Sequence, residues 1–508
     1  MKIVLTGRDL GLEQLALIAE EKAAVEIAPE AIERLKASRK LVYDLVESDV
    51  PVYGFNTGVG WNKDRHIAAD FFKEYNENLI HSHSLGVKPE ASEAEVRAAM
   101  AVRLNCLLNG NTGIEPSIAL RYADFLNLEI HPVIPERGSV GVGDITTLSH
   151  VGLAMIGEGE VNYQGRRMSA AEAHKLAGIE PVTLGPKDGL AIVSSNAFAM
   201  GQGGLVLHDL CRMADLADLV YAVSLTGYNG NTSPLDPRVH ELKGLEGQKH
   251  SAALASSFLE DSYIYAPDPA KPVQDPLSYR SGVYLNGTLR DALSFVNGYA
   301  RIQMNTSDDN PCLLLEDRAM ISCSNFEAST VTVGFEMLAI ALSHVSKMSC
   351  QRIIRIVNPE LTGLPRFLTP DEGLVHAFGT AQKVFTSLDT EIRHLSNPSS
   401  ADFMPLAGSI EDHANNFTHV VQRVRKIADN LKYIFSLELM HACQAITLRL
   451  QREPELRLSR PVRGAYDHYR QFIPWYDRDR PISPDIEKGY QLLKNGSILA
   501  AALEYLAR

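Results

Sequence analysis

Residues 328–357 read ASTVTVGFEMLAIALSHVSKMSCQRIIRIV, a long run in which apolar side chains recur every three or four positions. A second run of the same kind, residues 419–450, reads HVVQRVRKIADNLKYIFSLELMHACQAITLRL. A straight helix of about 30 residues spans about 45 Å, which exceeds the usual length of a helix in a globular domain. The two runs therefore predict a bundle of long helices.

Two further segments support a helical fold. Residues 197–226 carry apolar side chains on several faces, which predicts burial on all sides by neighbouring helices or by other subunits. Residues 92–108 have helical periodicity behind Ser92 and Glu95, whose spacing is that of a capping box.

Strand-like segments are short and lie near the N-terminus. We expect strands at 2–5 and at 159–163, the latter paired with 167–168 around the turn at Gln164-Gly165. Segments rich in Gly, Pro and Asn predict loops at 54–60, 109–116, 135–144, 227–237 and 264–283. We predict a loop-rich domain over 1–200 and a long-helix domain over 201–508.

Composition excludes several classes of function. The 508 residues carry a net charge of −13, which argues against a nucleic-acid partner or an anionic membrane surface. The N-terminus lacks the features of a signal peptide, and no uninterrupted apolar run is long enough to span a bilayer. The six cysteines are scattered and the histidines lack zinc-site spacing, so we expect reduced thiols, no metal site and a cytoplasmic location.

Polar and glycine-rich motifs follow one another along nearly the whole chain. They read VYGFNTGVG at 52–60, NLIHSHSLG at 78–86, PERGSVGVGD at 135–144, VQDPLSYR at 273–280, SDDNP at 307–311 and EDH at 411–413. In this order they resemble the aromatic amino acid ammonia-lyases, the histidine, phenylalanine and tyrosine enzymes with their aminomutase relatives. The resemblance implies a mainly α, ammonia-lyase-like fold with a central bundle of long helices and a loop-rich N-terminal part with a few short strands.

The resemblance also implies an assembly and an electrophile. Family members are homotetramers whose active sites draw residues from three subunits. Their Ala-Ser-Gly segment cyclises and dehydrates into methylidene-imidazolone, the MIO group. Here the corresponding loop is one residue shorter and reads Gly141-Val142-Gly143, and valine has no β-hydroxyl to lose. We therefore expect that MIO does not form and that the chain needs no cofactor.

Tyr53 corresponds to the family's essential base. Taken alone, a tyrosine between glycine-rich segments more often anchors its loop. Because a phenol has an ordinary pKa near 10, a base at this position needs electropositive surroundings, which backbone amides and Arg280 could supply.

Arg280 corresponds to the arginine that grips the substrate α-carboxylate, a task suited to a guanidinium fork. Its alternative is a solvated side chain or a pair with Asp275. Asn310 would support the same carboxylate, or it caps a turn before Pro311.

Ser82 and His83 stand where the family selects its ring, and this pair is typical of the histidine branch, as is Glu411. A carboxylate suits an imidazole N–H, and His83 can bond to the other ring nitrogen. Alternatively, Glu411 caps a helix or pairs with Arg423 or Arg425. The predicted catalytic residues are Tyr53, His83 and Glu411, and the predicted substrate-binding residues are Ser82, Ser194, Gln274, Arg280, Asn310 and Phe326.

Departures from the family pattern gather where the electrophile is made and used. They are Val142, Ser194, Leu277 and Ile410. We therefore favour a MIO-independent lyase that eliminates from, or adds to, a small aromatic or imidazole-bearing acid. The alternatives are a histidine-type lyase that releases ammonia and a non-catalytic homologue that binds an aromatic ligand.

Overall fold

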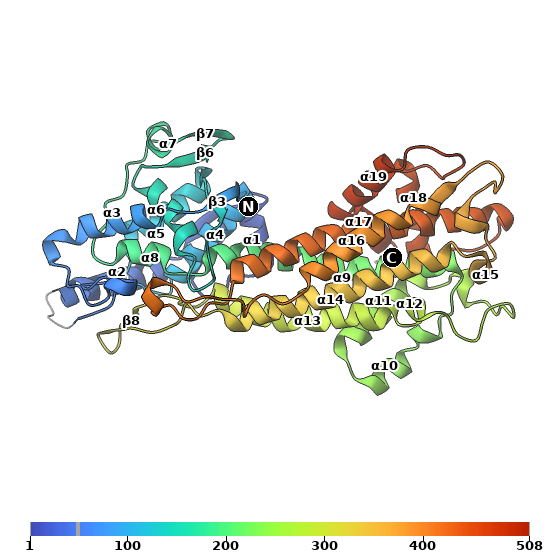
Figure 1. Cartoon of the computed structure of the whole chain (residues 1–508), viewed down its shortest axis with the longest axis horizontal. Helices are drawn as coiled ribbons and strands as arrows, with labels where there is room; N and C mark the ends of the chain where they lie inside the picture. Colours follow the sequence, from blue (N-terminus) through green and yellow to red (C-terminus); the bar gives the residue numbers. More distant parts are fainter. Residues whose placement is uncertain (1, 47–50, 507–508) are drawn as a thin grey trace. The chain divides into compact units, whose positions relative to one another are not determined.

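Helices dominate the structure of the chain, a computed structural model that describes residues 2–46 and 51–506 (Figure 1). The prediction of a mainly α fold with a few short strands is confirmed. Two compact units are distinguished: 1–208 with 296–335 and 398–422, and 209–295 with 336–397 and 423–508. The predicted domains 1–200 and 201–508 stay a prediction, because these units are each assembled from several segments.

The first unit contains eight whole helices and all the strands of the described residues. Its helices are α1 (Leu12–Ala19), α2 (Pro29–Val46), α3 (Phe72–His83), α4 (Glu93–Leu107), α5 (Pro116–Asn127), α6 (Ile145–Met155), α7 (Ala170–Ala177) and α8 (Asp188–Val193). Its strands are β1 (Lys2–Leu5), β2 (Ala24–Ile27), β3 (Val87–Glu90), β4 (Ile130–Pro132), β5 (Pro135–Arg137), β6 (Glu160–Tyr163), β7 (Arg166–Ser169), β8 (Cys312–Leu314) and β9 (Ala319–Ile321).

The strands form four small sheets. β1 pairs in parallel with β2, whereas β3–β5, β4–β6–β7 and β8–β9 are antiparallel. The predicted first strand and the predicted hairpin around Gln164-Gly165 are confirmed. The loop predicted over 135–144 is wrong at its start, because Pro135–Arg137 pairs with β3.

Four long helices contribute residues to both units: α9 (Ala197–Tyr228), α13 (Gly282–Met304), α14 (Ser329–Ile356) and α17 (Phe417–Arg452). Three of them confirm the long helical runs predicted from the sequence. By length and composition alone, 188–228 and 329–356 could cross a membrane, but their most apolar windows are 94% and 61% buried in the structure. Buried core helices pass the same test, so the finding is weak evidence for a membrane span.

The second unit contains the remaining helices of the described residues. They are α10 (Pro237–Lys243), α11 (Glu246–Leu259), α12 (Leu277–Arg280), α15 (Pro359–Thr362), α16 (Gln382–Leu395), α18 (Arg460–Phe472), α19 (Ser483–Lys494) and α20 (Ser497–Leu503). The loop predicted over 264–283 is therefore interrupted, since α12 forms one turn of helix directly after Pro276.

Helices α4 and α9 pack closely within the first unit. A Cβ at Gly201 would lie 2.5 Å from the backbone nitrogen of Ala99, so glycine is needed where these helices approach each other. Helix α4 begins with the predicted capping box, in which Ser92 and Glu95 bond to each other's backbone N–H groups. Its side chains from Glu95 to Leu107 are buried, which explains the weak amphipathicity of this segment.

Candidate active site

One cavity of about 850 Å³ in the first unit gathers most of the predicted site residues. Its volume suits a small organic ligand. The lining residues that the sequence predicted are Tyr53, His83, Val142, Ser194, Asn310, Phe326 and Glu411. Ser82, Gly141 and Gly143 do not line the cavity, and Gln274 and Arg280 belong to the second unit.

Tyr53 is half-buried at the start of a loop that closes on itself through an isolated bridge between Thr57 and His66. Its hydroxyl accepts a hydrogen bond from the backbone N–H of Gly60 at 3.0 Å. Burial raises the pKa of Tyr53, the Gly60 N–H lowers it and the charge of Glu411 raises it again. The net effect is a pKa above the ordinary value, so the electropositive surroundings expected for a base are incomplete in the free chain.

His83 lies at the C-terminal end of α3. Its Nδ1 is 2.8 Å from the carbonyl oxygen of Leu79 and 3.0 Å from the Ser82 hydroxyl. A neutral ring that donates from Nδ1 to this carbonyl presents Nε2 as an acceptor. Ser82 itself is exposed and donates to Leu79, which makes it a support for the ring of His83.

The altered loop is held by backbone contacts on both sides of Val142. The carbonyl of Val140 accepts from the N–H of Asn416 at 2.8 Å, and the N–H of Gly143 donates to Asn196 Oδ1 at 3.1 Å. Gly141 has a φ of 85° and no space for a Cβ beside Asn415. The loop thus requires glycine at Gly141 and directs the side chain of Val142 to the cavity lining.

Asp144 anchors the end of this loop. Its buried carboxylate accepts from the N–H of Ala199 at 2.8 Å and from the hydroxyls of Ser139 and Thr418 at 2.6 and 3.0 Å. Burial raises the pKa of Asp144 to about 6, although these three donors lower it. Because the Ser139 hydroxyl serves this carboxylate and also accepts from Gly141, it is engaged in fixing the loop.

Glu411 reaches the cavity from a short turn whose ends, Leu406 and Glu411, form a backbone bridge. Arg423, one of the alternative partners predicted for Glu411, bonds to Glu336 at 3.1 Å. Two residues after Glu411, His413 Nε2 lies 3.1 Å from a carboxylate oxygen of Glu327. Carboxylates therefore contribute strongly to this part of the lining.

The residues predicted to bind a carboxylate divide between the two units. In the first unit, Asn310 Oδ1 accepts from the N–H of Cys323 at 2.9 Å, which leaves its amide nitrogen as the group that could donate to a ligand. In the second unit, Arg280 donates to Gln274, whereas Asp275 bonds to Asn231. The predicted alternative of an Arg280–Asp275 pair is thus replaced by Arg280–Gln274.

Several residues that line the cavity were not predicted from the sequence. Lys63 follows the Tyr53 motif and forms an ion pair with Asp64 at 2.7 Å, while Val193 precedes Ser194. Glu327 directly follows Phe326, so its proximity to a predicted site residue was a usable signal. All six cysteines are free thiols, but Cys211 and Cys323 are only partly buried, and Cys323 lines the cavity.

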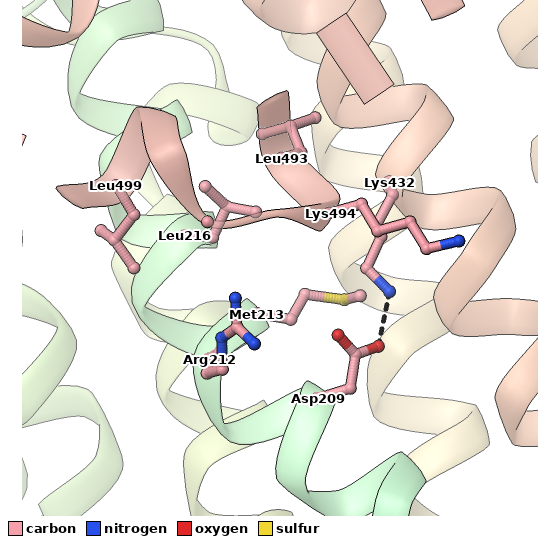
Figure 2. Close-up of a pocket in the computed structure, with 9 residues that line it drawn as sticks. Asp209, Arg212, Met213, Leu216, Lys432, Leu493, Lys494 and Leu499 are labelled. Carbon is pink, nitrogen blue, oxygen red and sulfur yellow. Dashed lines mark hydrogen bonds and ion pairs between the residues drawn. The ribbon is translucent and has the colours of Figure 1, made fainter. Parts of the chain in front are cut away.

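A second cavity lies in the second unit, between α9, α17 and the α19–α20 segment (Figure 2). Figure 2 shows the Lys432 ammonium directed at the Asp209 carboxylate, an ion pair of 2.5 Å. The volume of this second cavity is about 20 Å³, which is space for a water molecule. An amino-acid-sized ligand therefore fits the larger cavity and not this one.

Comparisons with known proteins agree with the mainly helical fold. The model of the family described as aromatic amino acid lyase matches residues 10–471. The chain is 35% identical to histidine ammonia-lyase from Myxococcus xanthus over 98% of both proteins. The crystal structure of the ergothioneine-degrading enzyme ergothionase from Treponema denticola, in complex with desmethyl-ergothioneine sulfonic acid, has 44% identity and a TM-score of 0.94, covering 98% of this chain and 100% of that one. Histidine ammonia-lyase from Trypanosoma cruzi has 30% identity and a TM-score of 0.91, covering 99% and 96%. The chain belongs to the aromatic amino acid lyase family.

Proposed function

We propose that this chain is a MIO-independent lyase that eliminates trimethylamine from ergothioneine, the trimethylammonium betaine of 2-thiohistidine. The observation that carries the proposal is a site with a candidate base and ring-binding groups but with Val142 at the position of the electrophile-forming serine. A structural relative with 44% identity degrades ergothioneine, which supports this choice of substrate.

The residues around Val142 do not fit a MIO group. Valine has no hydroxyl that dehydration could remove, and no Xaa-Ser-Gly tripeptide occurs in residues 135–144. The nearest loop hydroxyl, on Ser139, is bonded to Asp144 at 2.6 Å. We therefore assign no step of the reaction to such a group and expect no cofactor.

A quaternary ammonium makes the electrophile unnecessary. In the proposed step, the Tyr53 phenolate removes a proton from Cβ, the C–H electrons form the Cα=Cβ double bond, and the Cα–N bond breaks. The nitrogen keeps that electron pair and leaves as neutral trimethylamine, so the products are trimethylamine and an imidazole-2-thione acrylate. A primary ammonium would first lose one of its own N–H protons to the base, and the neutral amine so formed would leave only as an amide ion unless it were activated.

The recognition residues suit an imidazole-bearing acid. Glu411 and His83 would bond to the two ring nitrogens, with Ser82 holding His83, and Arg280, Asn310 and Gln274 would bind the carboxylate. Ser194 and Phe326 complete the lining. We propose, from the family resemblance, a cytoplasmic homotetramer in which Arg280 and Tyr53 of one site come from different subunits.

Turnover of ergothioneine by the purified protein tests the proposal. We expect release of trimethylamine with growth of the acrylate absorption, and loss of at least about 100-fold of this activity in Tyr53→Phe. Tyr505→Phe, which alters an exposed tyrosine of the second unit, is the matched control. Absence of trimethylamine, or full activity in Tyr53→Phe, would contradict the proposal.

The second candidate is a histidine-type lyase, favoured by the Ser82-His83 pair and by the relatives of that name. It requires MIO, which forms with loss of two water molecules from the chain. An intact mass equal to the unmodified sequence, together with no urocanate from L-histidine, would exclude it. A mass lower by two waters would exclude the MIO-independent mechanism instead.

A further inference from the structure

We propose that Val142, Val193 and Phe326 form an apolar wall that binds the N-methyl groups of a quaternary ammonium on the substrate α-carbon. This inference rests on the proposed function, and it assigns the selection of a fully methylated amine to a specific part of the cavity. All three side chains line the cavity, and none of them has a hydrogen-bonding group.

Asn196 brings the three segments of the wall together. Its Oδ1 accepts from the N–H of Gly143 at 3.1 Å, and its Nδ2 donates to the carbonyl of Phe326. The N–H of Asp144 donates to the carbonyl of Ser195 at 2.6 Å, which ties the altered loop to the end of α8. Val142 precedes Gly143, and Val193 is the last residue of α8. These hydrogen bonds therefore hold the three wall residues around the buried side-chain amide of Asn196.

The charge of the lining favours a cation. Three carboxylates line the cavity, on Glu327, Glu411 and Asp412, against Lys63 and the Arg280 that the proposed assembly would add. Lys63 is also paired with Asp64. A permanent cation therefore gains Coulomb energy in the cavity even with its histidines neutral.

The wall would bind a trimethylammonium group more tightly than a primary ammonium group. Three N-methyl groups spread the positive charge over an apolar surface and need no hydrogen-bond acceptor, so they gain from contact with valine and phenylalanine side chains. A primary ammonium has three N–H donors that must be satisfied once water is removed. Of the three wall residues and Ser194, which follows Val193, only Ser194 has a side-chain acceptor, which is too few for three such donors at the wall itself.

Binding measurements in the Tyr53→Phe background test the wall without turnover. We expect this variant to bind ergothioneine at least tenfold more tightly than 2-thiohistidine, which lacks only the three methyl groups. Adding Val142→Thr, which keeps the shape of the side chain and introduces a hydroxyl, should reduce that preference at least threefold. Phe326→Leu provides a second variant, and Val239→Thr on the exposed face of α10 is the matched control, with an unchanged preference.

The outcomes separate this inference from the proposed function. If wild-type protein converts ergothioneine but both wall variants keep the full methyl preference, the wall is overturned and the reaction stands. If the preference exists and the wall variants reduce it, but wild-type protein releases no trimethylamine, the wall stands and the proposed reaction fails. Failure of the protein both to bind and to convert ergothioneine overturns both.

Discussion

The pKa of Tyr53 decides when the proposed base is available. Burial and the charge of Glu411 hold that pKa above its ordinary value, while the N–H of Gly60 acts in the opposite direction. A base must be deprotonated before it acts, so kcat/KM, which reports the free enzyme, should rise with pH into the alkaline range. A substrate with a permanent positive charge would favour the phenolate within the complex.

Glu411→Gln should move the rise of kcat/KM with pH, the alkaline limb of the pH profile, to lower pH. The substitution removes a negative charge that raises the pKa of Tyr53, even though it also weakens ring binding. The measurement is kcat/KM for ergothioneine between pH 6 and the alkaline limit of stability. Asp412→Asn removes the neighbouring charge as a control and should leave the limb in place; a limb that stays fixed in Glu411→Gln would refute the coupling.

At the scale of elements, local signals fix where helix α4 begins. The Ser92 hydroxyl accepts from the N–H of Glu95 at 3.3 Å, and the Glu95 carboxylate accepts from the N–H of Ser92 at 2.9 Å. Ser92→Ala should lower the free energy of unfolding by about 1 kcal/mol, measured by denaturant titration. Ser343→Ala, at a half-buried position inside α14, is the matched control and should change stability far less.

Helices α14 and α17 are joined in the second unit by a buried ion pair. Arg352 donates to Glu438 at 2.5 and 2.8 Å, and Ser349 donates to the same carboxylate. Arg352→Met leaves this carboxylate buried without its cation and should cost about 3–5 kcal/mol of stability. The double variant Arg352→Met with Glu438→Gln should recover part of the loss, and a double variant that is no more stable than the single one would contradict this account.

At the scale of the whole molecule, each active site of the proposed tetramer would be built from residues of more than one subunit. Helix α14 leaves Val333, Met337 and Ile340 exposed at spacings of four and three, which places them on one helical face. Large apolar residues in such a row are typical of a face that another chain covers.

Mixing inactive subunits tests the sharing directly. Tyr53→Phe and Arg280→Met should each be inactive, but tetramers assembled from both should regain about a quarter of wild-type activity, because each residue comes from an intact copy half of the time. Tyr53→Phe mixed with the double variant is the control and should stay inactive. No recovery in assembled mixtures would show that both residues of a site come from one chain.

The sequence predicted what depends on local patterns. Periodicity over 30 residues identified α14 and α17, and the Gln164-Gly165 turn identified the β6–β7 hairpin. β5 was missed because three residues gain strand character only by pairing with β3, far away in the chain. Within the cavity, Tyr53 and Glu411 were found through motifs, whereas Lys63 was missed because nothing in its local sequence distinguishes it from a solvated lysine.

The hydrogen bond from Gly60 to the Tyr53 oxygen links the ionisation of a side chain to the order of its loop. A phenolate accepts more strongly than a phenol, so whatever promotes loss of the phenolic proton also tightens the turn that carries Gly60. Slower deuterium uptake at the Gly60 amide would therefore report deprotonation of Tyr53. Binding of a cationic ligand could be followed at the Gly60 amide in an enzyme variant that is too slow to form product.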